Sequence, residues 1–182
     1  MSTKNKLLLV EIVSVLSSLA YTWLYIEMNP WCFLFAIIGA SGFLYLCWKK
    51  SLLAESGLQV FYIGMAVYGF LNLNSEWLVD HWSWLSHFLV IVISTFAMFA
   101  LSWFLKQKTK AKLPLIDSFT TVFSLAATFL MVEFVHENWL YWIIIDVISI
   151  ALYFKRKMYF GAFLFFLYTI LAVKAYFFPE IW

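Results

Sequence analysis

Seven long apolar runs, separated by short clusters of charged residues, Asn, Pro or Ser, occupy most of this 182-residue chain. Each run approaches the roughly 20 residues that a helix needs to cross a bilayer. A membrane-spanning β-strand needs only about ten residues of alternating polarity, a pattern that these uniformly apolar runs lack. We therefore expect an all-α integral membrane protein with seven transmembrane helices, over residues 7–26, 31–48, 56–73, 84–105, 115–135, 139–154 and 159–178.

The composition excludes two other broad classes of protein. Hydrophobic residues make up 65% of the chain and charged residues 12%, against about 45–50% and about 25% in a soluble domain. Intrinsic disorder needs the opposite balance of high charge and low hydrophobicity. The sequence also lacks the motifs of metalloproteases, serine hydrolases and phosphate-binding loops. We therefore expect no enzyme, and no bound metal or cofactor.

The charged residues between the runs alternate in sign. Basic residues precede the first run and follow the second, fourth and sixth, whereas acidic residues follow the first, third, fifth and seventh. By the positive-inside rule, the basic ends lie in the cytoplasm. This predicts a cytoplasmic N-terminus and an external C-terminus, with only Lys174 of the twelve basic residues inside a run. The lysine clusters are then determinants of topology, and we expect no nucleic-acid partner.

The two ends of the chain resemble each other when the sequence is shifted by 108 positions without a gap. Four runs separate equivalent helices, so both copies cross the membrane in the same direction, which is a parallel 3+1+3 repeat of three-helix bundles. We expect a first repeat over 1–80, a linker helix with a basic cytoplasmic loop over 81–112, and a second repeat over 113–182. The identical pairs are Trp31 and Trp139, Ile37 and Ile145, Ser41 and Ser149, Leu44 and Leu152, Tyr45 and Tyr153, Lys49 and Lys157, Ala54 and Ala162, Tyr68 and Tyr176, and Phe70 and Phe178.

Polar residues recur at spacings of three and four inside both repeats, so they share helical faces. Polar groups inside a bilayer usually face the interior of a bundle or a cavity. We therefore expect both repeats to line one binding site. The candidate residues are Trp139, Trp142, Asp146 and Ser149 in the sixth run, Gln59 and Tyr62 in the third, and Thr121 in the fifth.

Asp146 stands out among these candidates because it lies about seven residues into its run, near the expected centre of the bilayer. A carboxyl group there must be paired, protonated or bound to a cationic ligand. With Trp139 and Trp142 on the same face, it suits a flat, positively charged ring held by cation–π contacts. A structural interpretation also stays open, in which the two Trp residues form part of an interfacial belt and Asp146 bonds a neighbouring helix.

The histidines and cysteines give no sign of a site. His81 and His87 are six residues apart, which does not place two ligands on one helical face, and His136 stands alone. We expect all three histidines at the surface. Cys32 and Cys47 lie about 22 Å apart on one helix, which is too far for a disulfide.

The stretch 117–176 closely resembles the second half of the PnuC-type nicotinamide riboside transporters. The signature is a Trp-x-x-Trp-x-x-x-Asp/Asn pattern at Trp139, Trp142 and Asp146, followed by a Tyr-x-basic turn and an aromatic last run. Residues 57–62 look like part of the third helix of the same family. The resemblance extends over essentially the whole chain, from the first run to the last.

The resemblance implies a bacterial inner-membrane transporter with a fold like that of the sugar-transporting SWEET proteins. It implies a homotrimer surrounded by membrane lipid. It also implies movement of a vitamin down its gradient, followed by trapping through cytoplasmic phosphorylation. Carried over residue by residue, Trp139, Trp142 and Asp146 would line the vitamin site, with Gln59 and Tyr62 from the other copy opposite.

The substrate stays open between two vitamins, because position 146 is Asp where some nicotinamide riboside transporters carry Asn, and Phe70 and Leu73 stand where many members carry Trp. Nicotinamide riboside and thiamine are both flat cations with a hydroxyl-bearing arm, whereas riboflavin is neutral and larger. We favour a facilitative uniporter for nicotinamide riboside, with thiamine as the alternative. Two other classes are an ion-coupled transporter, in which Asp146, Glu11 or Asp117 carries a proton, and a non-transporting scaffold, for which the sequence shows no large docking loop.

Overall fold

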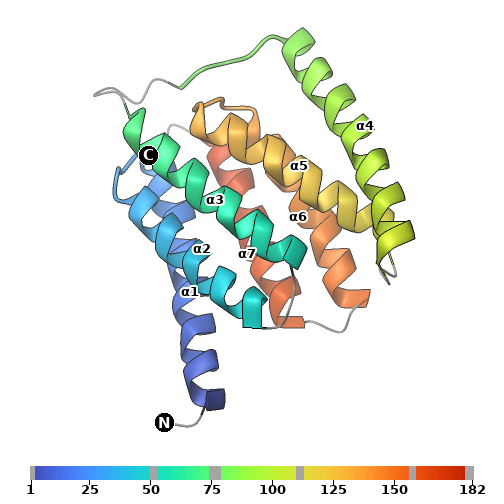
Figure 1. Cartoon of the computed structure of the whole chain (residues 1–182). Helices are drawn as coiled ribbons and strands as arrows, with labels where there is room; N and C mark the ends of the chain where they lie inside the picture. The colour runs from blue at the N-terminus through green and yellow to red at the C-terminus, as the bar shows by residue number, and fades with distance from the viewer. Residues whose placement is uncertain (1–2, 50–52, 74–78, 110–112, 156–158, 179–182) are drawn as a thin grey trace. The chain divides into compact units, whose positions relative to one another are not determined.

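The computed structural model describes residues 3–49, 53–73, 79–109, 113–155 and 159–178. Within these ranges the chain forms seven helices, which confirms the all-helical fold expected from the apolar runs, with ends that differ by a few residues. The helices, shown in Figure 1, are α1 (Thr3–Ile26), α2 (Cys32–Lys49), α3 (Leu53–Leu71), α4 (Trp84–Lys108), α5 (Pro114–Val132), α6 (Asn138–Lys155) and α7 (Tyr159–Phe177).

Five of the described helices, α1, α2, α4, α5 and α6, are long and apolar enough to cross a membrane. The other two contain somewhat shorter apolar stretches, Ser56–Leu71 in α3 and Gly161–Phe177 in α7. Large apolar side chains are widely exposed on these helices, as expected for surfaces that face lipid.

Two compact units divide the chain, Met1–Trp77 and Leu78–Ile181. In the first unit, α2 packs against both α1 and α3. In the second unit the helices pack in chain order, α4 on α5, α5 on α6 and α6 on α7 (Figure 1). Neighbours in sequence are therefore neighbours in space within each unit, as short connections between antiparallel helices require.

Local sequence signals explain where α4 and α5 begin. Ser83 is the N-cap of α4, and its hydroxyl oxygen accepts a hydrogen bond from the Ser86 backbone N–H at 3.2 Å. Pro114 opens α5, where its missing N–H costs nothing, and Asp117 lies in the first turn, where the helix dipole favours a negative charge.

The turns that end α1 and α5 have the same backbone geometry. Met28 and Phe134 adopt left-handed conformations, with φ angles of 51° and 55°. In both turns the N–H of the following residue donates to a carbonyl of the last helical turn at 2.9 Å. This pattern is a Schellman motif, which normally uses glycine at the left-handed position.

The helices α2 and α6 bury residues at corresponding positions. The buried residues of α2 are Cys32, Phe33, Gly39, Ala40 and Leu46, and those of α6 include Asn138, Trp139, Ile145, Asp146 and Leu152, each 106 positions later. The offset from sequence identities is 108, which pairs Trp31, 65% exposed, with Trp139, 6% exposed. The buried positions of α2 and α6 therefore align at an offset of 106, two residues less than the offset of 108 at which identical residues align.

Glycines allow α1 and α2 to pack closely. A Cβ atom on Gly39 would lie 2.6 Å from the Ser18 hydroxyl oxygen, and one on Gly42 would overlap the Ser14 hydroxyl oxygen. Cys32 and Cys47 are both free thiols, as their separation along α2 predicted.

Candidate functional site

The helix α6 carries four of the predicted binding residues on one face. Trp139, Asp146 and Ser149 are buried, with Asp146 only 2% exposed, and Trp142 is partly buried. The spacing of three and four residues places these side chains in successive turns of the same stripe. The side chains of this stripe are therefore wholly or partly buried in the second unit, and burial by itself assigns no ligand.

Asp146 is buried without a partner. Within the described part of the chain its carboxyl group makes no hydrogen bond and no ion pair, and no such partner lies on α5 or α7, the helices that pack against α6. Burial of a charged or polar group without compensation is costly. The structural interpretation that Asp146 bonds a neighbouring helix finds no support among these residues.

Trp142 also keeps an unused polar atom. Its indole Nε1 is buried and has no hydrogen-bond partner among the described residues. The ring packs against a hydrophobic cluster of the second unit, made of Ala127, Leu130, Val135, Tyr141 and Ile145. A buried indole N–H normally finds an acceptor, so both Asp146 and Trp142 have unsatisfied polar groups one helical turn apart.

The remaining predicted residues lie on other helices. Thr121 on α5 donates its hydroxyl hydrogen to the Asp117 carbonyl of its own helix at 2.8 Å, which leaves the hydroxyl oxygen free only to accept. Gln59 and Tyr62 are half-buried on α3 in the first unit, where Tyr62 lies beside Phe61 at a ring-centroid distance of 6.1 Å. The structure therefore brings together the α6 residues, and it places Gln59 and Tyr62 on one helix of the first unit.

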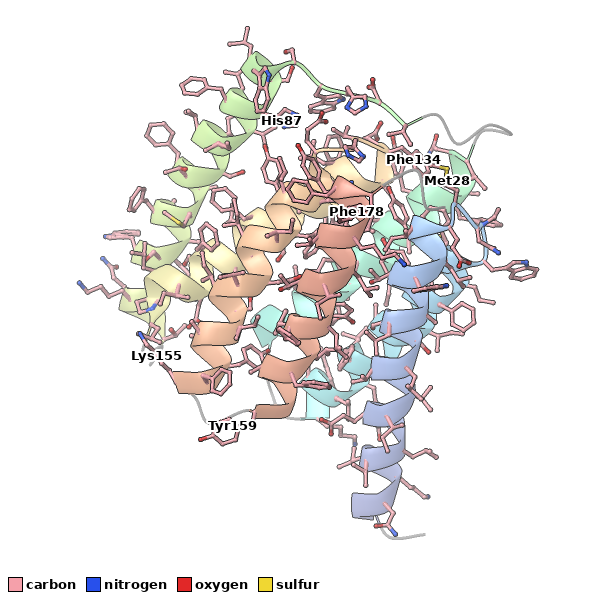
Figure 2. All side chains as sticks on the ribbon, turned by 180° about the vertical axis from the view of Figure 1, so that it is seen from behind. Met28, His87, Phe134, Lys155, Tyr159 and Phe178 are labelled. Atoms are coloured by element: carbon pink, nitrogen blue, oxygen red, sulfur yellow. The ribbon has the colours of Figure 1, made fainter. Side chains whose placement is uncertain are left out.

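The prediction that all three histidines lie at the surface is wrong for His87, which is buried at 5% exposure, and is confirmed for His81, whereas His136 is half-buried. His136 also does not stand alone, because its ring lies 5.3 Å from that of His81. The contacts of all three bring them close to the turn between α5 and α6. Figure 2 labels His87 and Phe134 at this end of the second unit. Spacing along the chain did not reveal this cluster because the segment before α4 folds back onto that turn.

Glu137 connects two of these histidines. His81 Nδ1 lies 2.8 Å from Glu137 Oε1, and His87 Nε2 lies 3.5 Å from Glu137 Oε2. Partial burial acts to raise the pKa of the Glu137 carboxyl, but the hydrogen bond with His81 and those with backbone N–H groups outweigh it, so the pKa is lowered. On its other side, His87 Nδ1 shares a hydrogen bond with the Tyr141 hydroxyl at 3.1 Å.

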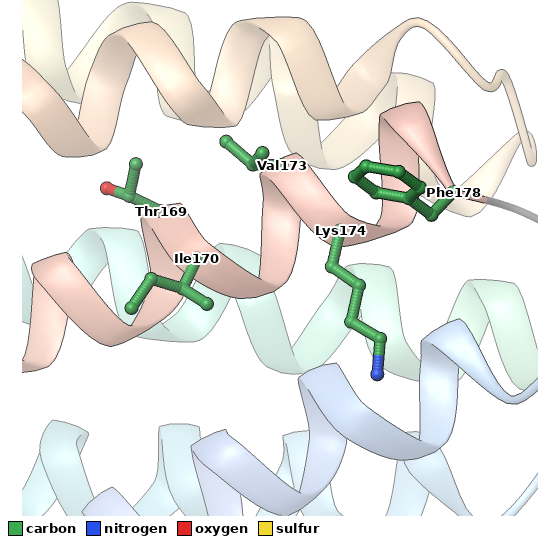
Figure 3. Close-up of a pocket in the computed structure, with 5 residues that line it drawn as sticks. All are labelled: Thr169, Ile170, Val173, Lys174 and Phe178. Atoms are coloured by element: carbon green, nitrogen blue, oxygen red, sulfur yellow. The ribbon is translucent and has the colours of Figure 1, made fainter. Parts of the chain in front are cut away.

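A groove of about 330 Å³ runs along α7 and is lined by Thr169, Ile170, Val173, Lys174 and Phe178, drawn in Figure 3. None of the seven predicted binding residues lines this groove. Its exposed lining is apolar, and Ile170 and Lys174, one helical turn apart, extend on the same side of the helix (Figure 3).

No group of three His, Cys, Asp or Glu side chains within the described residues is placed to hold a metal ion. What the second unit does contain is apolar helices of membrane-spanning length that enclose a carboxyl and an indole N–H without partners. Buried polar groups of this kind inside membrane helices mark a path or site for a solute. The fold and this face define a multi-pass membrane protein of the transporter class, and not an enzyme.

The chain belongs to the nicotinamide mononucleotide transporter family, whose model matches residues 8–182. The resemblance to PnuC-type transporters is thereby confirmed. Among solved structures, the chain is similar to one described as the crystal structure of the vitamin B3 transporter PnuC, with a TM-score of 0.74 and 19% identity, over 94% of this chain and 80% of that chain. At this identity the likeness shows the fold alone. No match was found among curated proteins.

Proposed function

We propose that this protein is a facilitative transporter of a B-vitamin precursor with a flat cationic ring, and that nicotinamide riboside is its substrate. The observation that carries the proposal is the buried, unpartnered carboxyl of Asp146 one turn from the unpartnered indole N–H of Trp142. A cationic ring supplies the positive charge that the carboxyl lacks, and a carbonyl or hydroxyl group of the same ligand supplies an acceptor for the indole.

The proposed site consists of Trp139, Trp142, Asp146 and Ser149 on α6, with Thr121 on α5 and with Gln59 and Tyr62 on α3. Trp rings stack on the vitamin ring, and Asp146 or Gln59 orients it. Since no basic residue belongs to this set, a neutral riboside arm suits the face better than a phosphorylated one, although the family takes its name from the mononucleotide.

Thiamine is the second candidate substrate. It is also a flat cation with a hydroxyl-bearing arm, so the same pair of Trp142 and Asp146 suits it equally well. Equilibrium binding of the purified protein to nicotinamide riboside, nicotinamide mononucleotide and thiamine, followed by calorimetry, separates the three. Selective binding of the riboside supports the proposal, whereas binding of none of them contradicts it.

Mutation of Trp142 tests the proposed face directly. We expect Trp142→Ala to lower the affinity for nicotinamide riboside about tenfold or more, because an aromatic contact with a desolvated cation contributes up to about 2 kcal/mol. Trp84→Ala is the matched control, since Trp84 is 81% exposed at the start of α4. If Trp142→Ala and the control bind nicotinamide riboside with equal affinity, Trp142 does not contact the ligand and the proposed site on α6 is wrong.

The proposed architecture is a parallel 3+1+3 repeat of seven membrane-crossing helices. Two observations support it, namely the matching left-handed turns at Met28 and Phe134 and the matching burial of α2 and α6. In this arrangement residues 1–80 and 113–182 form the two copies and residues 81–112 form the linker helix with its basic loop. Rocking of the copies around a site at the midplane then exposes the ligand to each side in turn.

The proposed setting is the bacterial inner membrane, with the N-terminus in the cytoplasm and the C-terminus outside, and with three copies of the chain surrounded by lipid. Within the second unit, Lys155 lies at the end opposite to His87 and Phe134 (Figure 2), which agrees with a basic cytoplasmic end. A single cysteine introduced at His81, in a variant without Cys32 and Cys47, is expected to react with an impermeant thiol reagent from outside the cell. After uptake, cytoplasmic phosphorylation traps the vitamin.

A further inference from the structure

The segment that leads into α4 is joined to the turn between α5 and α6 by its backbone. The Asp80 N–H donates to the Phe134 carbonyl at 3.0 Å, and the His136 N–H donates to the Asp80 carbonyl at 2.9 Å. These two bonds form an isolated bridge between residues far apart in sequence. They bring His81, the next residue along, to the start of α6.

One carboxylate lies between two imidazole rings at this junction. His81 contacts one oxygen of Glu137 and His87 faces the other. His87 Nε2 and Glu137 Oε2 are both buried, lie 3.5 Å apart and have no hydrogen-bond partner within the described residues. A small approach of these two atoms would complete a second bond, so the geometry is poised for a charged histidine to close it.

Glu137 directly precedes the first turn of α6, which carries Trp139, and His87 bonds Tyr141 in the next turn. The two histidines therefore hold the beginning of the helix that bears the predicted site. We propose that His81, His87 and Glu137 form a pH-sensitive clamp, which tightens as the pH falls from about 8.5 to about 6 and fixes the start of α6 to the start of α4.

The sign follows from the charge of each partner. The lowered pKa of Glu137 keeps its carboxyl ionised throughout this window, and the stability that it contributes disappears only when the pH falls through that lowered value. Histidine side chains generally take up a proton between about pH 8 and pH 5. A proton on either imidazole therefore adds positive charge beside a carboxylate that stays negative, and the attraction grows.

Other titratable groups around the clamp modify this effect. The Asp80 carboxylate, which accepts the His81 backbone N–H at 2.8 Å, adds attraction for a charged His81. His136 opposes it, because its ring lies 5.3 Å from that of His81. The remaining groups are Glu133 at the end of α5, Tyr141 on α6, and Tyr176 on α7, which stacks on His136.

The test compares melting temperatures of the purified full-length protein at about pH 6 and about pH 8.5. We expect the native protein to melt at a higher temperature than Glu137→Gln, and this difference in melting temperature to be larger at the lower pH by about 2 °C or more. Glu27→Gln is the matched control, since Glu27 is an exposed carboxylate in the turn after α1, and its difference in melting temperature from the native protein is expected to be equal at both pH values.

A difference in melting temperature that is equal at the two pH values, or larger at the higher one, overturns the clamp. If Glu137→Gln does not fold, His81→Gln replaces it, because His81 has a largely exposed side chain and a glutamine amide has an N–H group to donate to Glu137 Oε1 but carries no charge at any pH. The same increase of the difference at the lower pH is expected for this variant.

Measurement of nicotinamide riboside affinity at both pH values links the clamp to transport, and this step alone rests on the proposed function. We expect the native protein to bind several-fold more tightly at the lower pH, with the difference abolished in Glu137→Gln. If the native protein binds no nicotinamide riboside at either pH, the proposed function is contradicted. The clamp is then still tested by the melting temperatures alone.

Discussion

Asp146 is the residue whose surroundings say most about the ligand. It is buried on α6, and no described residue gives its carboxyl a hydrogen bond or a positive charge. Proteins commonly give up stability at functional sites in this way, because the group is arranged for a ligand and not for the empty state. A variant at this position should therefore change stability and recognition in opposite directions.

The first prediction concerns recognition of charge by Asp146. Reduced (1,4-dihydro) nicotinamide riboside has nearly the same shape as the oxidised form but a neutral ring. We expect the native protein to prefer the cationic form, and Asp146→Asn to lose about tenfold of this preference, because an amide keeps the shape and loses the charge. The ratio of the two dissociation constants, measured by calorimetry, decides it.

Asp146→Asn should also raise the melting temperature of the ligand-free protein by a few degrees, since a neutral amide costs less to bury. Ser149→Ala, at another buried position of the same stripe, is a suitable control for loss of a polar group without loss of charge. An unchanged preference together with an unchanged melting temperature would show that Asp146 is an ordinary interior residue.

At the level of helices, the contact between α1 and α2 depends on glycine. Gly42 faces Ser14, whose hydroxyl donates to the Val10 carbonyl at 2.7 Å and is fully enclosed. We expect Gly42→Ala to lower the free energy of unfolding by about 1–3 kcal/mol, because an added methyl group has no space between the helices. Denaturant titration of the purified protein measures the change.

Gly64→Ala is the matched control for that experiment. Gly64 lies inside α3 with no atom within 4 Å of the position that a Cβ would take. Alanine favours helix over glycine by about 1 kcal/mol, so this variant should be neutral or more stable. If both glycine variants were equally tolerated, the close packing of α1 and α2 would have no energetic importance.

In the turn after α1, unlike at Gly42, a substitution is expected to stabilise the protein. Met28 is 47% exposed and adopts a left-handed conformation, which costs a residue with a side chain roughly 1 kcal/mol relative to glycine. Met28→Gly is therefore expected to raise the free energy of unfolding by up to about 1 kcal/mol. Met28→Val should lower it, because a branched side chain is the least suited to this conformation. The same titration distinguishes the two, and a loss of stability in both would contradict the argument.

The helices and the inward face of α6 were predictable from sequence because both follow from local periodicity. Hydropathy marks a helix within one run, and spacings of three and four mark one face of it. The clamp was not predictable, since His81 and Glu137 are 56 positions apart and His87 and Tyr141 are 54 apart. No local pattern reports such contacts.

The register of the proposed repeat likewise depends on packing that no local pattern reports. Identities at an offset of 108 include Trp31 and Tyr45, which are both well exposed on or beside α2. Aromatic residues are common at membrane-facing positions, so they align without any structural equivalence. The burial of α2 and α6, which depends on packing within each unit, indicates an offset of 106 instead.

For the whole molecule, facilitated diffusion and ion coupling predict different end points of transport. A carrier without coupling changes the rate at which a solute equilibrates, whereas its final distribution is set by the solute's own gradient. Tightening of the clamp by acid should therefore alter the initial rate of uptake and leave the plateau unchanged. A carrier in which Asp146, Glu11 or Asp117 moves a proton together with the vitamin would raise the plateau on the side to which protons flow.

We expect proteoliposomes that contain the purified protein, with the membrane potential held at zero by valinomycin and equal K⁺ concentrations on both sides, to take up nicotinamide riboside only until the internal and external concentrations are equal. An imposed pH gradient, acidic outside, should change the initial rate and not this plateau. Addition of a protonophore, which collapses the gradient, should likewise leave the plateau where it was. Accumulation of the vitamin above its external concentration, if abolished by the protonophore, would instead establish proton coupling. The unpartnered carboxyl of Asp146 would then be the first group to test as the proton carrier. In that case Asp146→Asn is expected to bind the vitamin and fail to accumulate it.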